Sequence, residues 1–433
     1  RSEPAMPPTA LPHAPSYYAA TAHAAPPRPA LDGDTSADVC VIGAGYTGLS
    51  TALHLAKRGR SVVVVEANRV GWGASGRNGG QLHSGQRRDQ ETLEKWFGEA
   101  RARALFDLAE EAKRTVKGLI AEHAIDCDWR DGLIHAVHKK AWLADAKHEV
   151  DHLVARYGYP GATLLDAAEL AAAIGTDVYF GGWRDGTAGH LHPLNYCLGL
   201  ARAAEEAGVR IHEATRAARI DAAAGRPRVV TATGTITATD VVIAANGYLD
   251  GLDRDIDARV MPIRNYVAAT APLGDLADRL IPGREAVADS RFVVHYWRLS
   301  ADGRLIFGGG ETYGHRDPKD IAGFVRGHMA KIYPGLAEVE ITHAWGGTLA
   351  VTMNRMPYFR RLKPGLYTAS GYSGHGVAIA TLAGKLMAEA IDGDTARFDV
   401  MSAIPAQKFP GGPLFRLPTL VLAMSWFALR DRL

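Results

Sequence analysis

Cysteine is scarce in this sequence. Its 433 residues include three cysteines, Cys40, Cys127 and Cys197, and their spacing shows no pairing. Disulfide frameworks and cysteine-based metal sites need more cysteines at short, regular spacings, so both classes are disfavoured. So few cysteines suit a reducing compartment, and we expect the protein in the cytoplasm.

An excess of charge and long apolar runs are missing as well. The 49 basic side chains nearly balance the 47 acidic ones, which leaves a formal net charge of +2 and no reason to expect nucleic acid as a partner. No apolar run approaches the length that spans a bilayer, so we expect no integral membrane segment. Residues 1–30 are rich in Ala and Pro and lack the apolar core of a signal peptide.

The nearest candidate for membrane contact lies close to the C-terminus. Residues 417–429 are mostly apolar and are followed by Arg430 and Arg432. This pattern predicts a buried or amphipathic helix that docks on the protein itself or on a sister subunit. Peripheral contact with a membrane is the alternative interpretation.

Glycine, by contrast, is abundant, and one cluster of it spans residues 43–48, directly after the apolar run 39–42. A strand, a glycine turn, a helix and a second strand in this order are typical of a dinucleotide-binding βαβ unit. In such a unit Gly43 forms the turn, Gly45 lets the backbone approach a pyrophosphate, and Gly48 allows the helix to pack closely on the strand.

The residues after this turn predict how the rest of the nucleotide is held. Tyr46 and Thr47 open a helix that reaches about Lys57, and its N-terminus offers amide groups to a pyrophosphate. The next apolar run, 62–65, ends in Glu66, at the spacing of an acidic residue that accepts both ribose hydroxyls of an adenosine. A glycine turn in an ordinary α/β sheet would leave Glu66 unexplained.

A second glycine-rich segment, residues 71–81, favours a flavin over a nicotinamide cofactor. A nicotinamide dinucleotide needs nothing from this stretch, whereas the ribityl chain and ring of a flavin must be held beyond the pyrophosphate. Backbone amides, a hydroxyl and a cation suit that task. The residues expected to contact the cofactor here, and directly after Glu66, are Ala67, Arg69, Gly73, Ala74, Ser75, Arg77, Asn78, Gly79, Gly80 and Gln81.

Later segments are expected to return to the same site. Residues 240–247 predict a buried strand that stops at a glycine, and residues 366–369 predict another strand. The turn 371–376 then leads into a helix over 377–391. In these segments we expect cofactor contacts by Ala245, Gly247, Gly371, Tyr372, Ser373, Gly374, His375, Gly376 and Val377, and we expect a further contact by Gly346, which lies between them in the sequence.

The rest of the chain predicts a second domain. Helical patterns cover residues 93–123 and 141–157, and β-branched or alternating runs at 266–269, 292–297 and 304–307 favour a mostly antiparallel sheet. The predicted fold class is therefore α/β, with a discontinuous Rossmann-like FAD-binding domain and an inserted antiparallel-sheet α+β substrate domain.

We predict domain boundaries from these patterns. They are 31–96, 178–250 and 345–400 for the FAD-binding domain, 97–177 and 251–344 for the substrate domain, 1–30 for an N-terminal extension, and 401–433 for a C-terminal segment with an apolar helix.

Three motifs, in residues 43–50, 66–81 and 371–376, resemble the D-amino-acid-oxidase-type FAD flavoproteins. The resemblance runs nearly end to end. It implies FAD as the cofactor and places the turn at 371–376 under the pyrimidine side of the flavin ring. Some sarcosine-oxidising members tether FAD through a cysteine in the stretch that corresponds to 346–353. This chain has no cysteine after Cys197, so we expect non-covalent FAD.

Within this family the chain resembles one subgroup in particular, and that resemblance implies an activity. It is the oxidative deamination of gamma-glutamylputrescine, or of a related gamma-glutamylated alkylamine, to the aldehyde with ammonia and hydrogen peroxide. The carbon next to the amine would transfer a hydride to flavin N5, and molecular oxygen would be the second substrate. Two alternatives stay open: a membrane-surface amine or amino-acid dehydrogenase that passes electrons to a quinone, and a non-catalytic flavin-binding scaffold.

Candidate catalytic residues are Gln81, which should lie near the ring edge, His375 in the late turn, and Tyr266. His375 could equally supply only a backbone amide. Tyr266, Tyr296 and Trp345 could line an aromatic cavity suited to an alkylamine, although core packing competes with that interpretation for each.

Histidines and arginines outside the flavin motifs provide further candidates. The resemblance places His190 beside the substrate. His190 and His192 could share one face of a strand, but no matching Cys, Asp or Glu accompanies them, so we predict no metal. A carboxylate of the substrate could pair with one of Arg264, Arg298 and Arg316.

Overall fold

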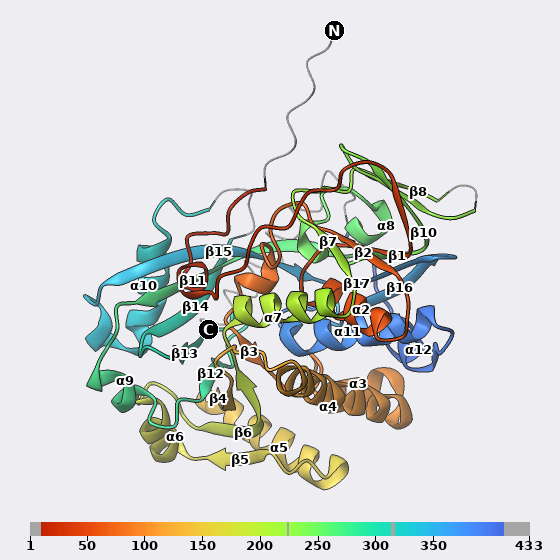
Figure 1. Cartoon of the computed structure of the whole chain (residues 1–433). Coiled ribbons are helices and arrows are strands. Elements are labelled where there is room, and N and C mark those ends of the chain that lie inside the picture. The colour runs from red at the N-terminus through yellow and green to blue at the C-terminus, as the bar shows by residue number, and fades with distance from the viewer. Residues whose placement is uncertain (1–9, 223–224, 313–316, 411–433) are drawn as a thin grey trace.

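The computed structural model describes residues 10–222, 225–312 and 317–410. Two sheets dominate it, and Figure 1 shows them meeting near the middle of the molecule. The first has eight strands, with β8 (Arg219–Asp221) and β9 (Arg228–Val230) on one side. Its main path runs β16 (Tyr358–Lys363), β17 (Leu366–Ser370), β10 (Thr235–Ile243), β1 (Thr35–Ile42), β2 (Val62–Val65) and β7 (Arg210–His212).

The strands β17, β10, β1, β2 and β7 are parallel to one another, whereas β16 and β9 pair with this group in antiparallel fashion. Both faces of this sheet are covered, which explains why β1 and β2 are apolar without alternation. Val39 and Val41 of β1 pack in a core with the helices α2 (Tyr46–Ala56), α11 (Gly376–Ile391) and α7 (Pro193–Glu206). Cys40 and Ile42 face a separate core on the other side.

The second sheet has nine strands and is antiparallel except where β12 lies beside β4. Its strands in spatial order are β15 (Ile341–Val351), β11 (Met261–Thr270), β14 (Leu305–Thr312), β13 (Tyr296–Leu299), β12 (Ala286–Asp289), β4 (Arg130–Ala136), β6 (Gly182–His190) and β3 (Gln81–Leu82), and β5 (Ala162–Leu165) pairs with β6. The mixed α/β fold with an antiparallel second sheet agrees with the predicted fold class.

The remaining helices surround the two sheets. They are α1 (Tyr17–Thr21), α3 (Gln90–Phe97), α4 (Glu99–Glu122), α5 (Leu143–Tyr157), α6 (Ala167–Ile174), α8 (Arg254–Asp257), α9 (Asp275–Leu280), α10 (Ile321–Ile332) and α12 (Ala396–Ser402). In the described ranges, no helix combines the length and the apolarity that crossing a membrane takes. The apolar stretch 417–429 lies outside the described residues.

Two predicted elements differ from the structure for local reasons. The helical pattern at 93–123 is split at Gly98, whose φ of +80° ends α3 and starts α4. The run 292–297 pairs as a strand only from Tyr296, because the Asp289 carboxylate accepts hydrogen bonds from the backbone of Arg291 and His295 and turns the chain there.

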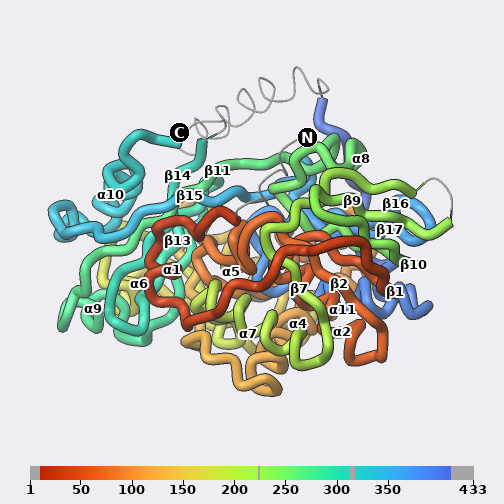
Figure 2. Tube along the Cα trace, turned by 45° about the horizontal axis from the view of Figure 1, so that its top comes forward, coloured from red at the N-terminus to blue at the C-terminus, as the bar shows by residue number. Residues whose placement is uncertain are grey.

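The chain crosses between the two sheets more often than the predicted boundaries suggest. β6 belongs to the second sheet, and α4 packs in the same core as α2 and α11. The N-terminal segment also joins both halves, since Figure 2 shows it running from α1 to β1 along the outside. The exact division into two domains stays a prediction.

Candidate active site

A cavity of about 790 Å³ lies where the carboxyl ends of β1, β2 and β10 face the second sheet. Ligands of open parallel sheets bind at this edge. The walls contain most of the residues predicted from the sequence to hold a cofactor or substrate: Gly43, Gly45, Tyr46, Thr47, Glu66, Ala67, Gly73, Ala74, Ser75, Arg77, Asn78, Gly79, Gln81, Ala245, Tyr296, Tyr372, Ser373, Gly374, His375, Gly376 and Val377.

The first glycine turn brings the N-terminus of α2 to this cavity. Gly43 has a φ of +106°, and a Cβ there would lie 2.8 Å from the carbonyl oxygen of Ala244. A Cβ on Gly45 would lie 2.7 Å from the Ser75 hydroxyl. Gly45 caps α2 without a side-chain hydrogen bond, and apart from the Tyr46 amide, which donates to Ser75, the first-turn amides are left to a ligand.

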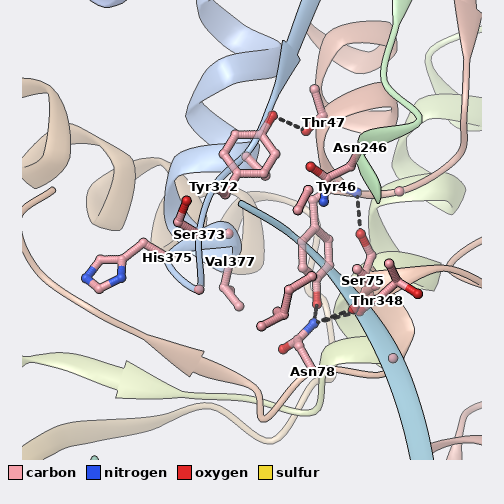
Figure 3. Close-up of a pocket in the computed structure, with 18 of the residues that line it drawn as sticks. Tyr46, Thr47, Ser75, Asn78, Asn246, Thr348, Tyr372, Ser373, His375 and Val377 are labelled. Carbon is pink, nitrogen blue, oxygen red and sulfur yellow. Dashed lines mark hydrogen bonds between the residues drawn. The ribbon is translucent and has the colours of Figure 1, made fainter. Parts of the chain in front are cut away.

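A second helix N-terminus faces the same cavity. α11 begins at Gly376 after His375, again without a side-chain cap. The turn before it holds Ser373 in a left-handed conformation, with a φ of +51°. Figure 3 shows how closely the two turns approach, with the Tyr372 hydroxyl bonded to Thr47 at 2.6 Å. Two uncapped helix ends therefore direct their positive dipole ends into one cavity.

Glu66 lies at the end of β2 in the cavity wall. Its carboxylate accepts hydrogen bonds from the backbone amides of Ala44, at 2.9 Å, and Asn68, at 3.0 Å. Burial raises the pKa of Glu66, and these two bonds oppose that rise. The amides fix the carboxylate beside the glycine turn, where remaining lone pairs can accept hydroxyl groups of a ribose.

The loop from Gly73 to Gln81 is held from several sides. Ser75 accepts a hydrogen bond from the Tyr46 amide at 3.0 Å, and Asn78 donates to the Tyr46 hydroxyl (Figure 3). Arg77 donates to the carbonyls of Trp72 and Gly346 and lies 4.3 Å from the centre of the Trp72 ring. Arg77 is therefore a rigid part of the wall.

The Tyr296 ring leaves no room for a side chain at two glycine positions in this region. A Cβ on Gly79 would lie 2.5 Å from the Tyr296 ring, and a Cβ on Gly308 would overlap the same ring. The Tyr296 hydroxyl donates to Asn265 at 2.6 Å. Gln81 stands nearby in the wall, where its amide nitrogen donates to carbonyls of Val287 and Trp297 in the second sheet.

Three predicted substrate or catalytic residues do not line the cavity. His190 bonds to the carbonyl of Arg284, and the Tyr266 hydroxyl bonds to Thr312 and Asp317. Trp345 lies behind the loop from Gly73 to Gln81, which we call the flavin loop, and donates to the Arg77 carbonyl at 2.9 Å. The residues predicted to contact the cofactor that stand behind the wall are Gly48, Arg69, Gly80, Gly247, Gly346 and Gly371.

Several wall residues were missed by sequence reasoning. Asn246 has a φ of +47° and accepts a hydrogen bond from the Gly371 amide, and Asn tolerates this conformation better than most residues. Thr348 and Tyr248 bond to each other across the cavity wall. His83 and Arg87 follow the flavin loop closely, but nothing in the local sequence marks them as wall residues.

Histidine rings form much of the wall next to α11. His83 stacks on His375 with 4.7 Å between ring centres, and His135 stacks on Trp183 at 4.1 Å. Burial lowers the pKa of His83 to about 3 and that of His135 to about 4, and it lowers the pKa of His375 strongly as well. All three rings are therefore neutral at pH 7.

The features of this cavity fit FAD. The uncapped end of α2 suits a pyrophosphate, and Glu66 suits the ribose that precedes it. The uncapped end of α11 suits a group that becomes negative on reduction. A family model described as FAD dependent oxidoreductase (DAO) matches residues 38–390. The chain belongs to this family. FAD is its cofactor.

Individual relatives agree with the family. A probable oxidoreductase, OrdL, of Rhizobium meliloti is 45% identical over 96% of this chain and 97% of its own length. The gamma-glutamylputrescine oxidoreductase of Escherichia coli is 41% identical over 97% of this chain and 99% of its own length. These matches confirm the family resemblance that the motifs predicted.

Solved structures confirm the fold. Glycine oxidase from Geobacillus kaustophilus superposes with a TM-score of 0.70 at 21% identity, covering 82% of this chain and 95% of that one. L-proline dehydrogenase from P. horikoshii superposes with the same TM-score at 22% identity, covering 83% and 94%. The predicted absence of a covalent link to FAD is tested by neither comparison and stays a prediction.

Glu66→Ala should weaken FAD binding more than it changes the chemistry of the holoenzyme that remains. Loss of charge-assisted hydrogen bonds to the ribose should cost about 2 kcal/mol, or tens of fold in the dissociation constant. Titration of apoprotein with FAD measures this change. Glu66→Gln keeps one acceptor oxygen, so its dissociation constant for FAD should lie between those of the wild type and Glu66→Ala. Equal affinities for all three proteins would contradict the assignment.

Proposed function

We propose that this enzyme oxidises the terminal amine of gamma-glutamylputrescine or of a related gamma-glutamylated alkylamine. The observation that carries the proposal is the 41% identity, over nearly the full length of both chains, to the Escherichia coli enzyme named for that substrate. The part of the cavity beyond the glycine turns supports it. That part is lined by rings suited to an alkyl chain, among them Phe106, Tyr159, Trp183 and Phe292.

The reaction takes a primary amine, oxygen and water to an aldehyde, ammonia and hydrogen peroxide. Bound FAD supplies the redox chemistry, because it accepts a hydride from the carbon next to nitrogen and passes the electrons to oxygen. The amine must be neutral when it reacts, and the resulting imine is hydrolysed to the aldehyde and ammonia.

The protein's own groups have limited tasks in such a reaction. The first-turn amides of α11, which have no side-chain cap, would stabilise the negative charge that a bound flavin acquires on reduction. The neutral rings of His83 and His135 add no positive charge that would repel an incoming amine, and each can accept a hydrogen bond from it. Gln81, fixed by two backbone carbonyls, keeps the wall rigid beside them.

Anaerobic mixing with a panel of amines tests the proposal. The panel contains gamma-glutamylputrescine, putrescine, sarcosine and D-alanine, and the visible absorbance of the flavin is followed. Gamma-glutamylputrescine should bleach the flavin at the highest rate per unit concentration, and hydrogen peroxide should appear after air is admitted. A higher specificity constant for D-alanine would overturn the substrate assignment.

The same experiment separates the alternatives. Bleaching without peroxide in air, but with reduction of an added quinone, would identify a dehydrogenase. A flavin that no amine bleaches would identify a scaffold.

A further inference from the structure

Three arginines line one part of the cavity: Arg87, Arg88 and Arg355. The first two lie in the loop between β3 and α3, and the third lies between β15 and β16, more than 260 residues later in the chain. Each of the first two is anchored through Nε to a backbone carbonyl. Arg87 donates to Ser373 and Arg88 donates to Asn354, both at 3.0 Å.

The loop that carries Arg355 is held in an unusual conformation. Arg355 has a φ of +66°, which costs a residue with a side chain about 1 kcal/mol. The side chain of Asn354 bonds to the amide of Met356 and to the carbonyl of Pro405, which fixes the loop on both sides. The guanidinium of Arg355 lies 4.8 Å from the centre of the Phe292 ring, another wall residue. The fold thus holds this side chain against the cavity despite the strain.

The positive charges of this arginine cluster act on one another. Burial, followed by the charges of Arg355 and Arg88, lowers the pKa of Arg87 to about 10, and Glu311 opposes this effect. Arg87 remains a cation at pH 7. Its two terminal nitrogens make no hydrogen bond within the part of the chain that the structure describes. A half-buried cation whose unused donors border a cavity is suited to an anionic ligand.

The arginines named from the sequence are less suited to that task. Arg264 forms an ion pair with Asp317, and Arg298 is buried against Gly79 and Tyr18. Neither lines the cavity. Arg316 lies outside the described residues.

We infer that the arginine cluster binds the α-carboxylate of the gamma-glutamyl group, with Arg87 as the main contact. This inference rests on the proposed function and adds to it the part of the wall that selects the substrate. A guanidinium offers two parallel donors to a carboxylate, which a lysine cannot match. The glutamyl end then lies at the cluster while the alkyl chain extends along the aromatic wall.

The same cluster selects against free diamines. Putrescine lacks the carboxylate altogether and has an ammonium group where gamma-glutamylputrescine has its amide, so it adds a positive charge to a cavity that already contains these three guanidinium groups. Repulsion of a competing ligand contributes to specificity as much as attraction of the right one. The cluster therefore accounts for recognition of a glutamylated amine and for rejection of the unmodified diamine.

The test compares Arg87→Met and Arg87→Lys holoenzymes with the wild type on three substrates: gamma-glutamylputrescine, N-acetylputrescine and putrescine. N-acetylputrescine has the same reactive amine and an uncharged amide end. We expect the ratio of kcat/KM for gamma-glutamylputrescine over N-acetylputrescine to fall about 100-fold in Arg87→Met, mainly through KM. Arg87→Lys should recover part of this ratio. In Arg87→Met the preference for gamma-glutamylputrescine over putrescine should also shrink.

Binding without turnover gives a second readout. Gamma-glutamylbutylamide has the glutamyl end but no second amine, and its dissociation constant from holoenzyme should rise about 100-fold in Arg87→Met. Arg114→Met, on the exposed face of α4, removes the same charge away from the cavity and should change neither quantity.

The outcomes separate the two claims. Wild-type enzyme that oxidises gamma-glutamylputrescine, with an unchanged substrate ratio and unchanged amide binding in Arg87→Met, would overturn the inference and leave the proposed function standing. Wild-type enzyme that oxidises none of the three amines would overturn both. A lower ratio in Arg114→Met as well would attribute the effect to overall charge and would also overturn the inference.

Discussion

Gly48→Ala should yield a protein that no longer holds FAD at ordinary concentrations. A Cβ at this position would overlap the carbonyl oxygen of Gly43 and lie 3.1 Å from a methyl group of Val41. A backbone carbonyl in a tight turn cannot move aside, so the first turn of α2 has to shift. The amides that it offers to the pyrophosphate shift with it. We expect the FAD dissociation constant to rise at least about 100-fold, which corresponds to about 2.7 kcal/mol.

Titration of apoprotein with FAD measures this change, and far-UV circular dichroism shows whether the variant is folded. Gly118→Ala is the matched control, because Gly118 lies within α4, near its C-terminal end, with open space where a Cβ would be. That variant should bind FAD normally and gain about 0.5–1 kcal/mol of stability. A folded Gly48→Ala protein with wild-type affinity would show that α2 does not support the cofactor.

Arg298→Met should destabilise the whole chain by about 3 kcal/mol. Arg298 is 1% exposed and, among the described residues, forms no ion pair with an acid. Its Nε donates to the Gly79 carbonyl at 2.8 Å, and a terminal nitrogen bonds to the Tyr18 hydroxyl at 3.3 Å. The guanidinium thus joins the flavin loop to the N-terminal segment. Methionine would leave the Gly79 carbonyl buried without a partner.

Urea unfolding of the apoproteins measures the loss, so that release of FAD does not contribute to it. Arg219→Met removes an exposed arginine that pairs with Asp221 at 3.1 Å, and it should alter stability by no more than about 0.5 kcal/mol. If Arg298→Met unfolded at the same urea concentration as the control, the hydrogen bonds to Gly79 and Tyr18 would not contribute to the stability of the protein.

The cofactor half of the site could be predicted because its signals are local. The apolar run of β1, the glycines of the turn and Glu66 lie within about thirty residues, and each has one physical task in that order. The same holds for the late turn, where the strand, the turn and α11 are consecutive. Chain neighbours decide such motifs, so the sequence contains nearly all the information needed.

The substrate half of the site could not be predicted in the same way, because its residues depend on which face of a strand points into the cavity. Tyr266 was a reasonable candidate by its chemistry, but Asn265 and Val267 line the cavity, and Tyr266 therefore points to the opposite face of β11. Tyr296 lies on the inner face of β13, whereas its neighbour Trp297 does not line the cavity. An alternating strand shows that two faces exist without showing which one borders the site.

The arginine cluster could not be predicted for a different reason. Arg87 and Arg355 are far apart in the sequence, and β3 and β15, which precede them, lie at opposite edges of the second sheet. Their loops meet through contacts such as the hydrogen bond from Arg88 to the Asn354 carbonyl. The pairing of β6 in the second sheet could not be predicted either, since most of its residues are not typical of a buried strand. Such pairings are decided by the fold as a whole.

The two helix ends that face FAD are made at very different times during synthesis. The turn before α2 is synthesised early, whereas α11 begins only at Gly376. A nascent chain of 350 residues has the complete β1–α2–β2 unit but neither β17 nor the second helix end. Its nucleotide site is therefore open on one side, with apolar residues of α2 that later pack on α11 still exposed. Secure capture of the cofactor belongs to the last stage of folding, after nearly all of the chain has been made.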